Sequence, residues 1–184
     1  MRILSSLRPP EKTGHTFSTR DIALAGLFAA LDITLSFFNI RLSPLIEIRF
    51  PFLVLAAAGM YGGPFFGIAV AVAGDIVSTL ITGGAFFFGF TFSYSLMACL
   101  FGLLYYRQRL SIPRAVAGAA VEWCISLTLH TLWLSLMYGT PYRALFFTRL
   151  AKCSVMFFIN AVLLHLVLHA FRRIFTALHL SEGA

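Results

Sequence analysis

The stretch that decides the fold is RFPFLVLAAAGMYGGPFFGIAVAVAGDIVSTLI, residues 49–81. It contains two charged side chains and is otherwise almost wholly apolar. A membrane-spanning helix needs roughly 20 mostly apolar residues. Gly62-Gly63-Pro64 interrupts the stretch, because glycine favours the end of one helix and proline the start of the next. We therefore predict two helices, at about 49–61 and 65–81, that form a tight hairpin in a membrane.

The whole chain has the composition of a membrane protein. Hydrophobic residues make up 59% of its 184 residues and charged residues 11%, with a mean hydropathy of +0.88, whereas a soluble domain has about 25% charged residues. Six helices of roughly 20 residues use about two thirds of the chain and leave short connections. We therefore expect an all-α integral membrane protein with one six-helix transmembrane domain over residues 18–176, flanked by cytoplasmic tails at 1–17 and 177–184.

The other helices are expected on both sides of this hairpin. One lies at about 18–38, one follows a turn at 82–89, one ends near Tyr138, and a long one covers about 142–175. The polar connection at 39–48 is long for a chain whose other connections are short, which makes it a candidate lid.

Basic residues predict the orientation. In an arrangement with both ends inside, the outer loops hold Arg41, Arg49 and Arg143. The cytoplasmic segments hold more of them: Arg2, Arg8, Lys12, Arg20, Arg107, Arg109, Arg114, Arg172 and Arg173. The positive-inside rule therefore favours both termini in the cytoplasm, in the plasma membrane. Because these residues are dispersed between apolar stretches, they do not form a nucleic-acid-binding patch.

The sequence lacks the common motifs of membrane and nucleotide enzymes. It contains no GxxxxGK[ST], HExxH or GxSxG pattern, so we expect no ATPase, metalloprotease or serine hydrolase activity. Any ATP would have to be bound and hydrolysed by a partner subunit. Cys99, Cys124 and Cys153 have no paired spacing, which argues against a disulfide framework or a zinc site. We expect neither metal nor cofactor. A membrane-embedded enzyme that acts on lipid through His130 and Glu122 remains the alternative from another class.

Ionisable side chains inside the predicted helices are the most informative residues. They are Asp32, Asp75, Glu122, Arg149 and Lys152, and each costs roughly 2.5–3.5 kcal/mol at the bilayer centre unless it is paired or faces a cavity. Arg149 and Lys152 are three residues apart and so share a helix face. This spacing favours a clamp for an anionic ligand. Alternatively, the two cations neutralise Asp75 or Glu122, or extend to lipid headgroups.

A polar and aromatic stripe marks the helix that ends near Tyr138. Its members follow helical spacing: Glu122, Ser126, His130, Trp133 and Met137. We expect its outer part to line a pocket. The alternative is that Trp133 belongs to the interfacial aromatic belt and His130 bonds to a neighbouring helix.

Two further groups have the chemistry to bind a flat heteroaromatic ligand. Rings that could stack on it crowd one turn: Phe86, Phe87, Phe88, Phe90 and Phe92. Contact with lipid is the alternative for most of them. Asp75 shares a stripe with hydroxyl side chains, and it either accepts hydrogen bonds from ligand nitrogens or pairs with a basic residue.

Small residues mark the first helix. Ala25 and Ala29, with Gly26 and Ala30 beside them, allow another helix to approach closely. That helix belongs either to this chain or to a partner.

Several of these residues fall in stretches that resemble one known family, the S-components of energy-coupling factor (ECF) transporters, specifically the folate family. The resemblance covers about 21–158 and rests on these segments: Ala25-xxx-Ala29, Ile48-Arg49-Phe50, Gly59 to Pro64, Gly67, Gly74-Asp75, Gly89-Phe90-Thr91, Thr131 to Ser135, Tyr138-Gly139 and Arg149-Leu150-Ala151-Lys152. It implies a six-helix subunit that captures a vitamin at its outer face and associates with a transmembrane T-component and two ATPases.

The resemblance also implies roles for particular residues. The ligand would be folate or a related pterin, with Arg49, Arg149 and Lys152 binding its glutamyl carboxylates. The ring system would lie among the remaining site residues: Phe50, Asp75, Phe86, Phe90, His130 and Trp133. The small-residue face at 25–30 would dock the T-component. His130 stands where asparagine is expected, so another water-soluble vitamin or precursor remains an alternative substrate.

Overall fold

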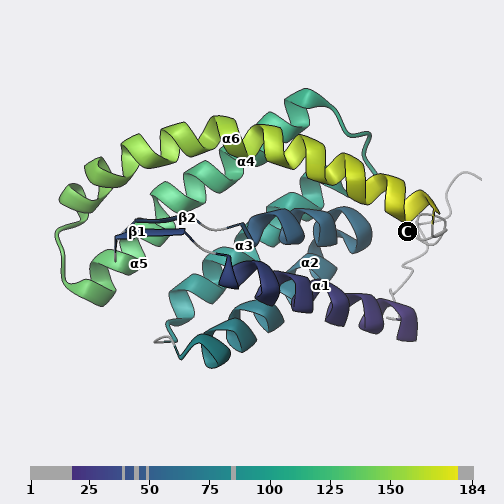
Figure 1. Ribbon diagram of the computed structural model, residues 1–184, viewed down its shortest axis with the longest axis horizontal. Coiled ribbons are helices and arrows are strands. Elements are labelled where there is room, and N and C mark those ends of the chain that lie inside the picture. Colours follow the sequence, from purple (N-terminus) through teal and green to yellow (C-terminus); the bar gives the residue numbers. More distant parts are fainter. Residues whose placement is uncertain (1–17, 39, 44–45, 49, 84–85, 178–184) are drawn as a thin grey trace, which may run out of the picture.

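The computed structural model describes residues 18–38, 40–43, 46–48, 50–83 and 86–177, with side chains described from Phe50 onwards and at 18–38. Its elements, in chain order, are α1 (Thr19–Phe37), β1 (Ile40–Ser43), β2 (Ile46–Ile48), α2 (Phe52–Thr82), α3 (Phe88–Tyr105), α4 (Ile112–Leu127), α5 (Leu129–Tyr138) and α6 (Tyr142–Ala177). Figure 1 shows the helices as one elongated bundle, with α6 along one long side.

The interruption predicted at Gly62-Gly63-Pro64 lies inside α2. Gly63 has non-helical backbone angles, φ 79° and ψ −169°, and Pro64 follows it. The break packs closely on α3, because a Cβ on Gly102 would lie 2.5 Å from the Pro64 Cα and one on Gly59 would lie 2.8 Å from the Gly102 nitrogen. Glycine at these positions therefore lets the α2 and α3 backbones approach each other.

The helix expected to run without a break to Tyr138 is divided into α4 and α5. Thr128 separates them, and its Oγ1 donates a 2.6 Å hydrogen bond to the Cys124 carbonyl. Thr131 Oγ1 donates to the Ser126 carbonyl at 3.4 Å. Hydroxyls that bond to main-chain carbonyls of the preceding turn bend helices, and this bend was not predicted.

The fold is helical, as predicted, and the connection at 39–48 adds one short element that was expected to be a loop. β1 and β2 pair as an antiparallel hairpin inside the connection at 39–48, with Ile40 opposite Ile48 and Arg41 opposite Glu47. The sequence alternates apolar and polar residues there, at Ile40, Leu42, Ile46 and Ile48, which is the period of a strand. Strands this short give a weak signal, and the polar residues were interpreted as a loop.

The two ends of the bundle carry different segments. The start of α1, the α3–α4 connection and the end of α6 lie at one end, and the hairpin, the α2–α3 connection and the α5–α6 connection lie at the other (Figure 1). Within the described residues, four segments are long and apolar enough to cross a membrane: α2, α3, α4 with α5, and α6.

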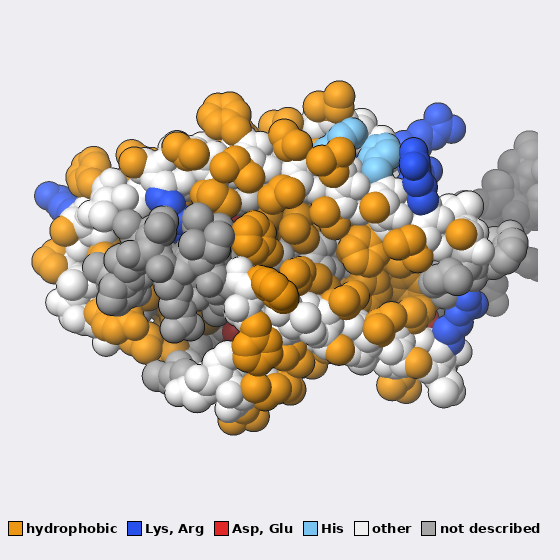
Figure 2. All heavy atoms as spheres, in the orientation of Figure 1, with side chains coloured by type: hydrophobic (Ala, Val, Ile, Leu, Met, Phe, Trp, Pro, Cys, Tyr) orange, Lys and Arg blue, Asp and Glu red, His pale blue; other side chains and the backbone are white. Residues whose placement is uncertain are grey.

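The surface between the two ends is apolar. Figure 2 shows hydrophobic side chains over much of the visible face. Phe65, Phe147 and Phe158 are 82%, 69% and 71% exposed, while Phe66 and Phe101 are buried in the core. A soluble monomer rarely exposes so large an apolar area, so this surface fits contact with lipid.

Candidate ligand-binding site

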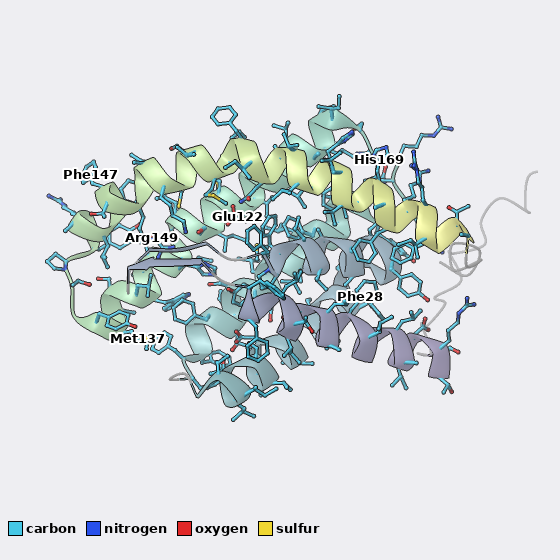
Figure 3. The ribbon with its side chains drawn as sticks, in the orientation of Figure 1. Phe28, Glu122, Met137, Phe147, Arg149 and His169 are labelled. Atoms are coloured by element: carbon cyan, nitrogen blue, oxygen red, sulfur yellow. The ribbon has the colours of Figure 1, made fainter. Side chains whose placement is uncertain are left out.

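Arg149 is a buried cation on an apolar helix. Its side chain is 6% exposed, whereas that of Phe147, two residues earlier on α6, is 69% exposed. Figure 3 shows Arg149 on the side of α6 that faces the other helices. Among the described residues, its Nε and Nη1 atoms have no hydrogen-bond partner. Burial of a guanidinium is costly unless hydrogen bonds and an opposite charge compensate, so this arrangement suits an anionic ligand.

Lys152 and Glu122 belong to the same charged group. Lys152 is one turn beyond Arg149 on α6 and is partly buried. Glu122 on α4 interacts electrostatically with both cations and accepts a 2.9 Å hydrogen bond from Asn160 Nδ2. Glu122 is therefore a carboxylate that lies near both cations within the described part of the chain.

The predicted aromatic residues of α3 and α5 meet in one cluster. The ring centroids of Phe90 and His130 are 5.7 Å apart, those of Tyr94 and His130 are 5.3 Å apart, and those of Phe87 and Trp133 are 5.8 Å apart. We call Phe87, Phe90, Tyr94, His130 and Trp133 the aromatic cluster. It presents flat faces beside the polar side chains of α3.

The phenylalanine-rich turn divides between this cluster and the surface. Phe86, Phe88 and Phe92 are 52%, 73% and 50% exposed, so they face outwards. Phe87, one of the rings predicted to stack on a ligand, packs on Trp133 instead. The sequence did not indicate which of these neighbouring rings are buried. The reason is that α3 begins only at Phe88, so helical spacing does not apply to Phe86 and Phe87.

A small pocket beside the aromatic cluster contains two carboxylates. It is lined by Asp32, Ser36, Pro51, Leu55, Ala71, Asp75, Ser78 and Tyr94. Asp75 accepts a 2.6 Å hydrogen bond from Thr91 Oγ1. Asp32 approaches from α1, and a Cβ on Gly74 would overlap its carboxylate. Asp32 was not predicted as a site residue, although its charge inside an apolar helix was a signal.

Tyr94 connects the parts of the site. It lines the carboxylate pocket, its ring packs at a tilt against that of His130, and it lies near Arg149. Carboxylates, aromatic rings and a buried cation therefore follow one another across the bundle, at the end that carries the hairpin.

The remaining predicted residues are distributed as follows. Arg49 lies outside the described residues. Phe50 is half-buried against the core. On α1, Ala25 and Ala29 are half-buried, while Gly26 and Ala30 are exposed. In the part of the chain that the structure describes, no three His, Cys, Asp or Glu residues gather as a metal site.

The fold is that of a membrane-embedded helical protein, and its described residues bring carboxylates, aromatic rings and a buried cation together. Comparison with known proteins identifies the family. Residues 20–168 match the family described as the substrate-specific component of ECF transporters, and the chain belongs to this family. Its members are transport components, which agrees with the absence of enzyme motifs noted above.

Individual relatives are similar over most of the chain. A folate transporter FolT of Clostridium novyi (strain NT) is 33% identical over 137 residues, which cover 73% of this chain and 80% of that protein. A FolT of Leuconostoc mesenteroides is 29% identical over 127 residues, with 67% and 68% covered. A crystal structure of FolT bound with folic acid superposes with a TM-score of 0.75 at 29% identity, over 80% of this chain and 92% of that one.

Proposed function

We propose that this chain captures folate, or a closely related pterin, as the substrate-binding subunit of an ECF-type uptake transporter. The buried guanidinium of Arg149, with Nε and Nη1 unpartnered among the described residues, is the observation that carries the proposal. The similar proteins support the choice of substrate, because two are named as folate transporters and a third was solved with folic acid.

The order of chemical groups in the site matches the order of groups in folate. Folate has a flat, nitrogen-rich pterin at one end and a glutamate with two carboxylates at the other. We assign the glutamate to Arg149 and Lys152, with Arg49 as a further cation. The pterin ring stacks within the aromatic cluster, and its N–H groups donate to the carboxylates of Asp75 and Asp32. Tyr94 adjoins both ends.

The topology that we propose has six membrane segments: α1, the two parts of α2, α3, α4 with α5, and α6. Arg20, Arg107, Arg109, Arg114, Arg172 and Arg173 lie on the elements or connections that meet at the end shared by the start of α1 and the end of α6 (Figure 1). The positive-inside rule assigns that end to the cytoplasm. The binding site then opens outwards, and the β1–β2 hairpin is placed to act as its lid.

The partners that we propose are a transmembrane T-component and two ATPases. ATP hydrolysis belongs to those subunits, and this chain contributes a docking face on α1. Gly26 supports that role, because a Cβ at this position would meet nothing within 4 Å. Small exposed residues let a partner helix approach closely in a membrane.

The decisive test is ligand identity. Purified protein should release folate or a related pterin that mass spectrometry identifies, and added folate should bind at micromolar concentrations or below. If a different vitamin is released and folate does not bind, the substrate is misassigned and only the membership of the family stands.

A further inference from the structure

The end of α6 carries four histidine and arginine side chains that take no part in the candidate ligand-binding site. His169 follows His165 by four residues, and Arg172 and Arg173 follow His169 by three and four, so all of them lie on one side of the helix. Both arginines are exposed and both histidines are half-buried. Figure 2 shows histidines beside basic side chains on one face of the molecule. We call these four residues the basic stripe.

The basic stripe begins where the apolar surface of α6 ends. Phe147, Val162 and Leu166 are exposed on the side of α6 that leads into it. Phe147 and Leu166 are 19 residues apart, or roughly 28 Å along the helix, and the hydrocarbon core of a bilayer is about 30 Å thick. Leu166 therefore lies near the edge of the hydrocarbon layer, which places Arg172 and Arg173 at the level of the lipid headgroups.

The histidine pair is held against the backbone of α6. The two ring centroids are 4.5 Å apart, and His169 Nδ1 lies 3.1 Å from the carbonyl oxygen of His165. Because a carbonyl oxygen only accepts, Nδ1 is the donor, and Nε2 is left for another group, to which it donates when the ring is protonated. Figure 3 shows His169 near the end of α6 that is opposite to Arg149. Two guanidiniums beside an imidazole suit the oxygens of a phosphate.

The acidic side chains that the structure describes have other partners. These are residues of neighbouring helices: Tyr61 for Asp21, Thr91 for Asp75, Asn160 for Glu122, and Gly74, against which Asp32 packs. Within the described residues, none of these carboxylates forms an ion pair with Arg172 or Arg173. The positive charges at the end of α6 therefore suit an anion that this part of the chain does not supply.

We propose that the basic stripe binds the phosphate of an anionic phospholipid headgroup, with Arg172 and Arg173 as the charged ligands and His169 beside them. The bilayer supplies this ligand at the depth of the stripe, and the exposed apolar side of α6 offers its acyl chains a surface. A phosphatidylcholine headgroup has no net charge, because choline offsets the phosphate, so the site should prefer an anionic lipid. This lipid site is separate from the vitamin site and does not depend on which vitamin the chain captures.

The test is the lipid selectivity of the purified full chain, measured by native mass spectrometry. The protein is released from micelles that contain equal amounts of phosphatidylglycerol and phosphatidylcholine with the same acyl chains. We expect the wild type to retain phosphatidylglycerol preferentially. Arg172→Gln combined with Arg173→Gln should reduce that preference by roughly ten-fold. Because both arginines are exposed, this variant should unfold at the temperature of the wild type in phosphatidylcholine alone.

Arg107→Gln combined with Arg109→Gln is the matched control. It removes the same charge from exposed residues at the same end of the bundle, in the α3–α4 connection (Figure 1). We expect it to keep most of the preference of the wild type. If the two double variants lose the preference equally, net charge alone attracts the lipid and the stripe is not a site. A wild type that retains both lipids equally would refute an anionic lipid as the ligand.

A soluble phosphate ester distinguishes a lipid headgroup from a free phosphate compound. Glycerol phosphate has the headgroup chemistry without acyl chains, so it lacks the apolar contact with α6. We expect millimolar glycerol phosphate to leave phosphatidylglycerol bound to the wild type. Displacement would assign the stripe to a soluble phosphate compound and overturn the lipid proposal. Since none of these measurements uses folate, a failure of the proposed function would leave their result unchanged.

Discussion

Trp133 Nε1 donates a 2.8 Å hydrogen bond to Ser93 Oγ, and this bond joins α5 to α3 within the aromatic cluster. Ser93 is fully buried and also donates to the Gly89 carbonyl at 3.0 Å. A Cβ on Gly89 would overlap the Trp133 ring. The position of the indole is therefore determined by a hydrogen bond and by the small size of Gly89.

Ser93→Ala should lower the free energy of unfolding by about 1–3 kcal/mol, because the indole N–H loses its buried acceptor. We also expect weaker folate binding, since the ring is no longer fixed. Ser95→Ala is the control, because that hydroxyl donates to the Thr91 carbonyl of its own helix, at 2.8 Å. Thermal unfolding and Trp133 fluorescence, in a Trp123→Phe background, measure the two effects. Equal behaviour of the two variants would contradict the prediction.

Arg149→Gln should weaken folate binding roughly ten- to a hundred-fold, because a charge-assisted hydrogen bond to a carboxylate contributes about 1.5–3 kcal/mol. Binding of a pterin without the glutamate should change much less. Arg149→Lys should restore folate binding only in part, since an ammonium does not reproduce the paired donors of a guanidinium. Fluorescence titration of each variant with both ligands measures the contrast, and equal losses for the two ligands would argue for unfolding.

Asp75→Asn tests the opposite end of the site. It removes a carboxylate that Thr91 already holds at 2.6 Å, so we expect folate and the truncated pterin to lose affinity equally, by roughly ten-fold. Asp75→Asn should then weaken the binding of both ligands, whereas Arg149→Gln should weaken mainly the binding of folate. If Asp75→Asn weakens only folate, the pterin does not bind at this carboxylate.

Helical spacing made the charged and aromatic parts of the site predictable. Arg149 and Lys152 lie one turn apart on a long helix, so their common face followed from the period. Gly62-Gly63-Pro64 likewise marked the break in α2 by its backbone preferences. Each of these features depends on residues that are close together in sequence, so the sequence of one segment is enough to predict it.

The remaining features depend on contacts between segments that are distant in sequence. The approach of Asp32 to Gly74, and the Glu122–Asn160 bond, join different helices and have no signature in either segment. Thr128 is compatible with a continuous helix, and only its hydroxyl bond to Cys124 reveals the bend.

The proposed orientation in the membrane predicts which connections a reagent reaches. In a background without Cys99, Cys124 and Cys153, cysteines at Gln108 and Pro141 occupy exposed positions in the α3–α4 and α5–α6 connections. We expect an impermeant thiol reagent to label only Pro141→Cys in intact cells and both after permeabilisation. Labelling of Gln108→Cys in intact cells would contradict the proposed orientation.

The exposure of the small residues on α1 distinguishes which of them can form the proposed docking face. Gly26 is exposed with nothing near its Cβ position, whereas Ala25 packs against the core. Gly26→Trp should therefore leave folate binding by the isolated subunit near normal and abolish uptake, because the bulky ring prevents close helix approach. Ala25→Trp should impair binding and uptake together.

A tryptophan on a different exposed helix position controls for the general effect of a bulky ring in the membrane. Val155 on α6 is 62% exposed, and Val155→Trp should bind and transport folate normally if that face meets only lipid. Uptake in cells with the complete transporter, compared with binding by each purified variant, separates docking from folding. Normal uptake by Gly26→Trp would show that the T-component does not approach this side of α1, since a tryptophan there would project several ångströms into any closely packed helix.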